Sequence, residues 1–412
     1  MAGEKKRLLD NFLSLGALQI VAYIFPLINL PYLSRVLGVD KFGLVFFAFA
    51  FMQYFNILTD FGFGLSATRE IAINRHNTNN LSNIFSSVSI LKMGLVFVSY
   101  LILCFCTIFV PKMHNNWIVF HLSFLMVLGN AIYPVWFFQG MERMRYITFL
   151  NILAKIIFVV LIFIFVKQES DYIIVPLLNS MGFLISGVIG FMFAIKTFGI
   201  KFYFPKLQSL KKQFKYSSDF FISRISVSLY SNTNTVCLGF AGSEYMVGLY
   251  VAAEKIYTAI NGLKEPFVSA LYPYISKYRD IKLYKKIFGL IFVGTFFITL
   301  ICFILAKPII TIFYGINMQE AYKIFKIFCI LFFVNVPSVL LGYPLLGGMG
   351  HTKVCNYSVI IASLLHVIFL IVLLLLNKLT IYTMAYLVLF TTFIEFNIRF
   401  WAVKKYKLLS VE

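Results

Sequence analysis

The sequence predicts an all-α integral membrane protein, with about twelve transmembrane helices arranged as two six-helix lobes. Composition is the first reason. Of the 412 residues 60% are hydrophobic and 13% are charged, and the mean hydropathy is +0.88, whereas about a quarter of a soluble domain is charged. The second reason is a series of apolar runs, each of about 20 residues and therefore long enough to cross a hydrocarbon core. The third is an internal repeat.

Each apolar run is expected to be helical, because unpaired backbone polar groups in lipid cost several kcal/mol each. The first run is interpreted as a retained helix and not as a signal peptide, since it is too long for an h-region and no small-residue cleavage site follows it. The predicted spans are residues 11–35, 42–64, 84–109, 117–140, 147–167, 173–195, 217–241, 247–272, 286–306, 321–346, 356–377 and 379–401.

The net charge of +20 predicts a topology and not a nucleic-acid partner. With the N-terminus inside, cytoplasmic segments hold 22 of the 36 Lys and Arg residues, and periplasmic loops hold 6. Such a bias follows the positive-inside rule and places both termini in the cytoplasm.

The sequence offers no recognisable catalytic or metal centre. Its six Cys and five His residues are scattered, without CxxC or HExxH spacing, and it contains no GxSxG, P-loop or GxGxxG motif. We therefore expect no enzymatic activity, no metal and no cofactor.

The two halves of the chain resemble one another at a shift of about 205 residues. The clearest matches pair Gly38–Asp40 and Gly43 with Gly242–Glu244 and Gly248, and Tyr133–Pro134 with Tyr343–Pro344. Six spans in each half preserve orientation, so residues 1–200 and 201–412 are expected to form parallel lobes about a pseudo-two-fold axis along the membrane normal. Transporters commonly have this construction, with a site near the midplane between the halves. The repeat favours transport.

Four predicted spans carry polar side chains, three of them as a stripe along one helical face. A charge at the centre of a span costs at least about 2.5–3.5 kcal/mol, so we expect the stripes to face a watery cavity. For the charged members, snorkelling to the headgroups or a structural ion pair is the alternative. The polar residues are Gln19 and Asn29 in the first span; Gln53, Asn56 and Asp60 in the second; Arg224, Ser228, Ser231 and Thr235 in the seventh; and Glu254, Thr258, Asn261 and Glu265, flanked by Lys255 and Lys264, in the eighth.

Two prolines, Pro26 and Pro266, lie in these striped helices. Each removes a helical hydrogen bond, so they are candidate kinks for a gating motion. Ordinary packing kinks remain the alternative.

Several motifs resemble the opening of Wzx-type O-antigen flippases, within the multidrug/oligosaccharidyl-lipid/polysaccharide exporter superfamily. The resemblance covers the whole chain in length and span number, and is strongest over the first 155 residues. The motifs are Pro31–Gly38, Phe42–Leu44, Asp60–Phe63, Ser66–Arg69 and Tyr133–Glu142, followed by Asn151 and Lys155.

This resemblance implies a flippase of the bacterial inner membrane that serves O-antigen and lipopolysaccharide biosynthesis. It would carry an undecaprenyl-pyrophosphate-linked repeat unit from the cytoplasmic to the periplasmic leaflet by alternating access, through a cavity lined by the first, second, seventh and eighth spans. Membrane lipid and the polysaccharide polymerase and chain-length machinery are the implied partners. A proton or sodium gradient is the expected energy source.

Cations and hydrogen-bonding groups suit a pyrophosphate and a sugar respectively. The candidate substrate contacts are Arg224, Ser228, Ser231, Lys255, Thr258, Asn261, Lys264, Gln53 and Asn56. The candidate ion-coupling residues are Asp60, Glu254 and Glu265.

Three other readings stay open. A multidrug exporter or a lipid II flippase of the same superfamily would share the fold; an exporter of cationic drugs would want an acidic, aromatic cavity. A membrane enzyme of glycan assembly would carry a large periplasmic loop, and the predicted spans leave no room for a loop of that size. A purely structural partner would not need buried polar stripes.

Overall fold

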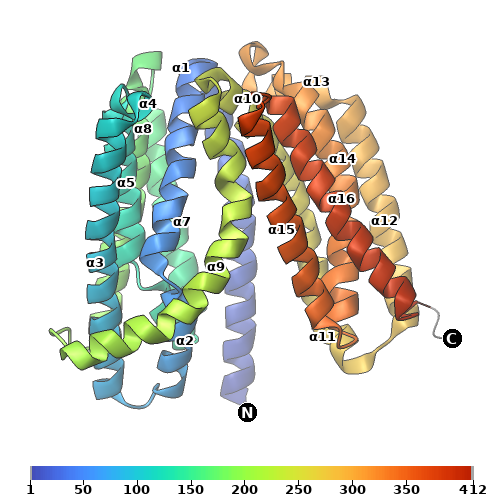
Figure 1. Cartoon of the computed structure of the whole chain (residues 1–412). Coiled ribbons are helices and arrows are strands. Elements are labelled where there is room, and N and C mark those ends of the chain that lie inside the picture. The colour runs from blue at the N-terminus through green and yellow to red at the C-terminus, as the bar shows by residue number, and fades with distance from the viewer. Residues whose placement is uncertain (1, 410–412) are drawn as a thin grey trace. The chain divides into compact units, whose positions relative to one another are not determined.

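The computed structural model describes the backbone of residues 2–409 and the side chains of residues 24–218, 220–221 and 233–409. Every regular element within these ranges is a helix (Figure 1). Nine helical stretches among the described residues are long and apolar enough to span a membrane. These observations confirm the all-α membrane fold, while the number of twelve spans stays a prediction.

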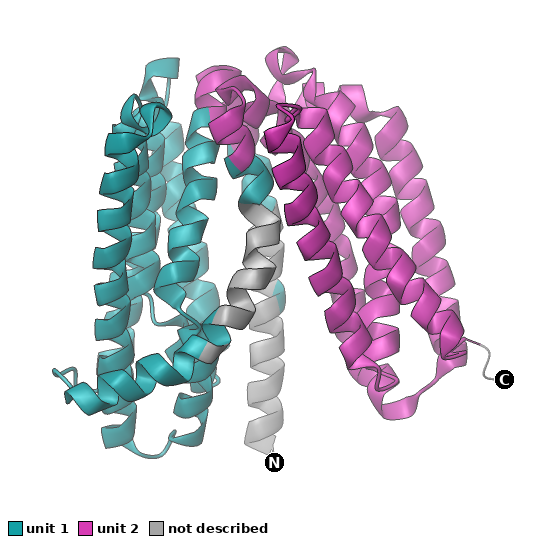
Figure 2. Ribbon diagram, viewed as in Figure 1, with its two compact units in different colours: residues 1–29, 44–236 teal, residues 30–43, 237–412 magenta. Residues whose placement is uncertain are grey.

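The chain forms two compact units (Figure 2): residues 1–29 with 44–236, and residues 30–43 with 237–412. The second unit therefore takes most of its residues from Cys237 onward and also includes a short segment from the middle of α1. The helices are α1 (Ala2–Asp60), α2 (Phe63–Ile73), α3 (Thr78–Phe109), α4 (Pro111–His114), α5 (Trp117–Ile132), α6 (Val135–Gly140), α7 (Met144–Phe165), η1 (Glu169–Ile173), α8 (Ile174–Phe198), α9 (Leu207–Ala241), α10 (Glu244–Asn261), η2 (Gly262–Lys264), α11 (Glu265–Tyr278), α12 (Ile281–Ile304), α13 (Ala306–Tyr314), η3 (Ile316–Met318), α14 (Ala321–Leu340), the π-helical turn η4 (Leu341–Gly347), α15 (Thr352–Leu375) and α16 (Ile381–Lys405).

In the first unit, α8 packs against both α5 and α7, and small residues set how closely these helices approach. A Cβ built on Gly187 would lie 2.6 Å from the Gly129 carbonyl oxygen of α5, and one on Gly182 would lie 2.4 Å from the Ala154 carbonyl oxygen of α7. Inside lipid, helix association depends on such close van der Waals packing, because there is little hydrophobic driving force between helices.

In the second unit, α14 is the central helix and contacts α10, α12, α13 and α16. Its buried side chains, among them Phe325, Phe328 and Phe332, form much of the interior. Tyr257 of α10 stacks on Phe328 with ring centroids 5.3 Å apart. α10 is thereby fixed against the middle of this unit.

The two glycine-containing stretches matched by the repeat touch one another within the second unit. Gly38 has a φ of 68° and interrupts α1, at the turn predicted between the first two spans. A Cβ on Gly43 would lie 1.9 Å from the Glu244 carbonyl oxygen, and one on Gly248 would lie 2.4 Å from the Val39 carbonyl oxygen. Only glycine lets the two backbones come this close.

Candidate functional site

The polar stripe near the end of α1 lies in the first unit, where three amide side chains meet. Asn56 donates from Nδ2 to the Gln53 Oε1 at 3.4 Å, and Asn130 of α5 donates from Nδ2 to the Asn56 Oδ1 at 3.2 Å. All three, like Asp60 at the end of α1, are half-buried. Asn130 was not predicted, because a lone Asn in an apolar span gives no stripe to recognise.

α9 carries the predicted seventh-span stripe. The hydroxyl groups of Tyr54 and Thr233 lie 2.9 Å apart and join α9 to α1 within the first unit. The predicted substrate contacts Arg224, Ser228 and Ser231 lie on the backbone of α9 but outside the residues whose side chains are described.

The predicted eighth-span stripe begins on α10 in the second unit. Thr258 is exposed, and its Oγ1 donates to the Glu254 carbonyl oxygen at 2.8 Å. Glu254, Lys255 and Glu265 are half-buried, whereas Ile256 on the opposite side of the helix is 4% exposed. The helix therefore has a buried apolar face and an accessible polar face, as its amphipathic pattern predicts.

Lys264 turns into the interior of the second unit. It is 7% exposed, and its ammonium group donates to the Oδ1 atoms of Asn261 and Asn335, each at 2.7 Å. Asn335 lies on α14, so the lysine ties the end of α10 to the central helix. A buried cation needs such partners, because leaving it without them is costly.

A 3₁₀ turn interrupts the α-helix directly before one of the two predicted kink prolines, and we call this interruption the α10–α11 break. α10 ends at Asn261, a 3₁₀ turn covers Gly262–Lys264, and α11 begins at Glu265 with Pro266 in its first turn. Proline fits there because a first-turn N–H has no helical acceptor. α1 continues through Pro26 and departs from helical backbone angles at Gly38. A gating role for either proline stays a prediction.

A second buried polar cluster surrounds Arg399 of α16, which is 4% exposed. Its guanidinium pairs with Glu395 one turn earlier, donates from Nε to the Ser358 Oγ at 3.0 Å and from Nη1 to the Ser338 carbonyl oxygen at 3.0 Å. The cluster thus joins α14, α15 and α16. The sequence signal for this cluster was a pair of opposite charges, Glu395 and Arg399, four residues apart in an apolar span.

Both clusters contact α14. Asn335 of α14 accepts from Lys264, and the Ser338 carbonyl oxygen of α14 accepts from Arg399. On the other side of Arg399, a Cβ built on Gly342 would lie 3.0 Å from the guanidinium carbon. Gly342 is the non-helical residue within η4, with a ψ of −119°. The clusters therefore connect the α10–α11 break to the π-helical turn after α14.

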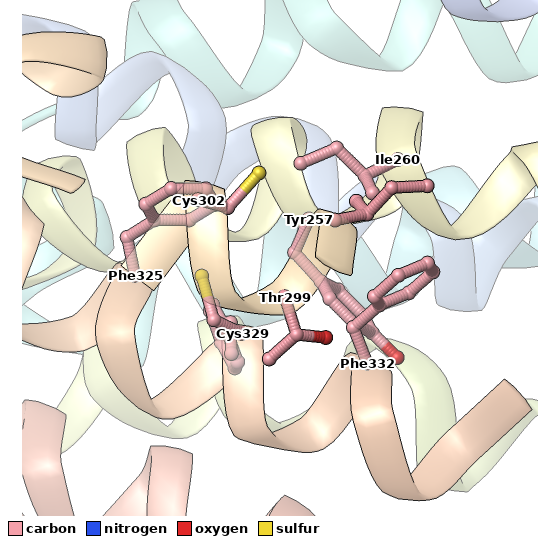
Figure 3. A pocket seen from close by; sticks show the side chains of 9 residues that line it. Tyr257, Ile260, Thr299, Cys302, Phe325, Cys329 and Phe332 are labelled. Carbon is pink, nitrogen blue, oxygen red and sulfur yellow. The ribbon is translucent and has the colours of Figure 1, made fainter. Parts of the chain in front are cut away.

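A small pocket (Figure 3) lies among α10, α12 and α14, and its lining includes Thr299 and Cys302 of α12 and Cys329 of α14. Its volume is about 10 Å³, about enough for one water molecule. The Thr299 hydroxyl is buried and has no hydrogen-bond partner. This pocket is too small for a sugar and is a packing defect of the bundle.

The motif Asp60–Phe63 makes structural contacts in the first unit. Phe61 stacks between Phe214 and Phe221 of α9, with ring centroids 4.5 Å from each. Gly62, at φ 78°, has no room for a side chain, because a Cβ would lie 2.7 Å from the Ser217 carbonyl oxygen. The motif therefore holds the start of α9.

The motif Pro31–Gly38 makes structural contacts in the second unit. The Ser34 hydroxyl donates to the Tyr314 carbonyl oxygen at 3.3 Å, and Arg35 donates to the Ile312 carbonyl oxygen. Phe42 packs edge-on against the Tyr314 ring. These bonds attach the middle of α1 to α13.

The fold is similar to that of solved structures whose descriptions are of transporters. An inward-facing multidrug resistance MATE family transporter of the MOP superfamily superposes with a TM-score of 0.69 at 15% identity, over 97% of this chain and 99% of that one. The lipid II flippase MurJ, in an inward closed conformation, gives a TM-score of 0.73 at 14% identity, over 96% and 87%. At these sequence identities the structural similarity shows the fold of this chain alone.

Comparison by sequence gives higher identities than these structures do. A protein of Escherichia coli (strain K12) named "Putative O-antigen transporter" is 32% identical over 276 residues, which are 67% of this chain and 66% of that protein. The profile of the family described as "Polysaccharide biosynthesis protein" matches residues 8–279. The match agrees with the resemblance carried by the motifs of the first half, and the chain belongs to the polysaccharide biosynthesis protein family.

Proposed function

We propose that this protein is a flippase for lipid-linked oligosaccharides. It moves undecaprenyl-pyrophosphate-linked repeat units from the cytoplasmic to the periplasmic leaflet of the bacterial inner membrane by alternating access, coupled to a proton or sodium gradient. Family membership, the name of the Escherichia coli relative and the transporter fold support a role in transport.

The single observation that carries the proposal is the accessible polar face of α10. Thr258 is exposed between the half-buried Glu254 and Asn261, on a helix whose other face is packed. Polar groups at membrane depth line water-filled paths or bind polar ligands. Hydroxyl-rich sugars match threonine and amide groups, and a pyrophosphate matches the nearby cation of Lys255.

Most of the candidate residues fall into three groups in the proposed cycle. Lys255 and Arg224 bind the pyrophosphate, while Gln53, Asn56, Thr258 and the serines of α9 bind sugar hydroxyl groups. Asp60, Glu254 and Glu265 exchange the coupling ion.

Lys264 stands apart from these residues, because its ammonium group is already held by Asn261 and Asn335. Two of its three N–H donors are used, and the side chain is 7% exposed, so contact with substrate would require the α10–α11 break to move away from α14. We therefore assign Lys264 to the conformational step rather than to the first encounter with the lipid.

The test is deletion of the gene, followed by complementation. Lipid-linked repeat units should accumulate on the cytoplasmic leaflet, and surface polysaccharide should disappear. Units that reach the periplasmic leaflet but stay unpolymerised would indicate an assembly enzyme, and altered drug sensitivity with normal polysaccharide would indicate a drug exporter. In the complemented strain, Arg224→Ala should abolish surface polysaccharide at normal protein abundance, while Arg224→Lys should retain part of it because the charge remains.

A further inference from the structure

An apolar groove lies on the first unit, among α3, α5, α8 and the linker that follows α8. Ile90 and Met93 of α3 form one wall, and Ala131 with the neighbouring Ile132 of α5 forms the floor. Its volume is about 490 Å³, within the range of roughly 300–1,000 Å³ that is typical of ligand sites. Ser89 is the one polar residue among the described residues that line it.

The remaining wall comes from the linker between α8 and α9. Phe202 packs edge-on against Phe191 of α8, with ring centroids 5.5 Å apart, and Phe204 is 87% exposed. A phenylalanine exposed to this degree would be unfavourable in water, but it is well placed in the apolar edge of a membrane.

Two buried serines of α3 hold this linker in place. The Lys201 amide donates to the Ser82 Oγ at 3.0 Å, and the Tyr203 amide donates to the Ser86 Oγ at 3.2 Å. The extended linker is therefore fixed along α3, and its phenylalanines are presented to the groove as part of a built wall.

Positive charge flanks the same wall. Lys201 and Lys206 lie on either side of the phenylalanines and are exposed. Beyond them, the first part of α9 passes the ends of α2 and α3 (Figure 1), where Asn83 of α3 donates to the Ser209 Oγ at 3.4 Å. It carries three more exposed lysines: Lys211, Lys212 and Lys215. Aromatic rings flanked by lysines are typical of a segment lying at the surface of an anionic leaflet.

We propose that this groove binds one acyl chain of an anionic phospholipid of the cytoplasmic leaflet. Its headgroup phosphate pairs with Lys201 and Lys206, and its chain lies between α3, α5 and Phe204. Apolar walls alone would accept any acyl chain, so the two lysines provide the selection for a negative headgroup. The site would tie the α8–α9 linker to the membrane surface and does not depend on which substrate the protein carries.

Native mass spectrometry of the delipidated full-length protein in detergent tests this site. The probes are phosphatidylglycerol and phosphatidylcholine with identical acyl chains. The wild type should bind phosphatidylglycerol in clear preference. The double variant Lys201→Gln/Lys206→Gln should lower that binding by about thirtyfold, toward the level of phosphatidylcholine, because each interfacial lysine contributes about 1 kcal/mol and about 1.4 kcal/mol corresponds to a factor of ten. Lys201→Arg/Lys206→Arg should keep it.

The matched control is Lys307→Gln/Lys353→Gln, which removes the same charge from two exposed positions of the second unit. This control should bind like the wild type, and an equal loss in both double variants would overturn the site in favour of non-specific attraction. Phe204→Ser should weaken binding of both lipids, since it removes part of the chain wall while altering a side chain that supports little of the packing. Unchanged binding in that variant would also overturn the proposal. Displacement of phosphatidylglycerol by equimolar undecaprenyl phosphate would instead reassign the groove to a polyprenyl chain.

Discussion

The Lys264 ammonium group donates a hydrogen bond of 2.7 Å to the Asn335 Oδ1 and so links the break between α10 and α11 to the central helix of the second unit. The link is polar, although most of the buried side chains of α14 are apolar. A polar link of this kind can break and re-form without repacking large side chains, which suits a helix break that has to move.

We predict that Asn335→Leu lowers the stability of the protein. It removes one acceptor from a buried cation, at a cost of about 1–3 kcal/mol. The midpoint of thermal unfolding in detergent should fall accordingly. Asn397→Leu, at an exposed position of α16, is the matched control and should unfold like the wild type. Equal midpoints for all three proteins would show that the Lys264–Asn335 bond is not needed.

Arg399→Met should be more damaging, because it leaves the Glu395 carboxylate buried without its ion-pair partner. Breaking a buried pair from one side costs about 3–5 kcal/mol. The double variant Arg399→Met/Glu395→Leu should recover much of this loss, since both charges are gone. Abundance in the membrane and the unfolding midpoint measure the effect. A double variant no more stable than Arg399→Met would mean that the serine contacts matter more than the ion pair.

Gly43→Ala should destabilise the second unit, since its Cβ would lie 1.9 Å from the Glu244 carbonyl oxygen. Forcing the two backbones apart is expected to cost about 1–3 kcal/mol, as overpacking does elsewhere. Gly289→Ala is the control, because nothing lies within 4 Å of a Cβ built there and alanine favours the helix. Thermal unfolding should separate the two variants clearly, and a wild-type midpoint for Gly43→Ala would contradict the close approach.

Cysteine labelling should distinguish the two faces of α10. In a background with the six native cysteines replaced by alanine, Thr258→Cys should react rapidly with a small hydrophilic thiol reagent. Ile256→Cys should react slowly, because Ile256 is 4% exposed. Gel-shift assays after timed labelling give the two rates. Similar rates would show that the polar stripe does not line a watery path.

Reporter fusions test the orientation derived from the 22-to-6 distribution of basic residues. Fusions after Leu210 and Lys285 should report a cytoplasmic location, and fusions near Lys167 or Asn317 a periplasmic one. A periplasmic signal after Leu210 would contradict both the topology and the arrangement of six spans in each half. It would also remove the basis for placing the α8–α9 linker at the cytoplasmic leaflet.

The helical membrane fold could be predicted from the sequence because lipid restricts the backbone so strongly. Long apolar runs have few alternatives to helix once water is absent. The non-helical residue Gly38 lies between two predicted spans, because such a turn depends on local backbone chemistry. A 3₁₀ turn precedes Pro266, while a kink for gating at this proline stays a prediction.

The sequence predicts less well which groups the polar side chains contact. Arg399 and Glu395 are four residues apart, so their pairing could be anticipated, but Ser338 and Ser358 come from other helices. Lys264 was expected on the flank of the α10 stripe, and it instead reaches Asn335, 71 positions further along the chain.

The sequence by itself therefore determined the class of protein, its helical segments and the polar faces that those helices carry, because these follow from local hydrophobicity and spacing. The tertiary structure alone decided which polar groups meet. Gly43 and Gly248 lie far apart in the chain, yet their close approach lets two backbones touch, and the buried bonds of Lys264 and Arg399 depend on how α14 and α16 pack. Such contacts depend on how separate helices approach one another in three dimensions, and the hydrophobic pattern of a single helix does not specify its partner.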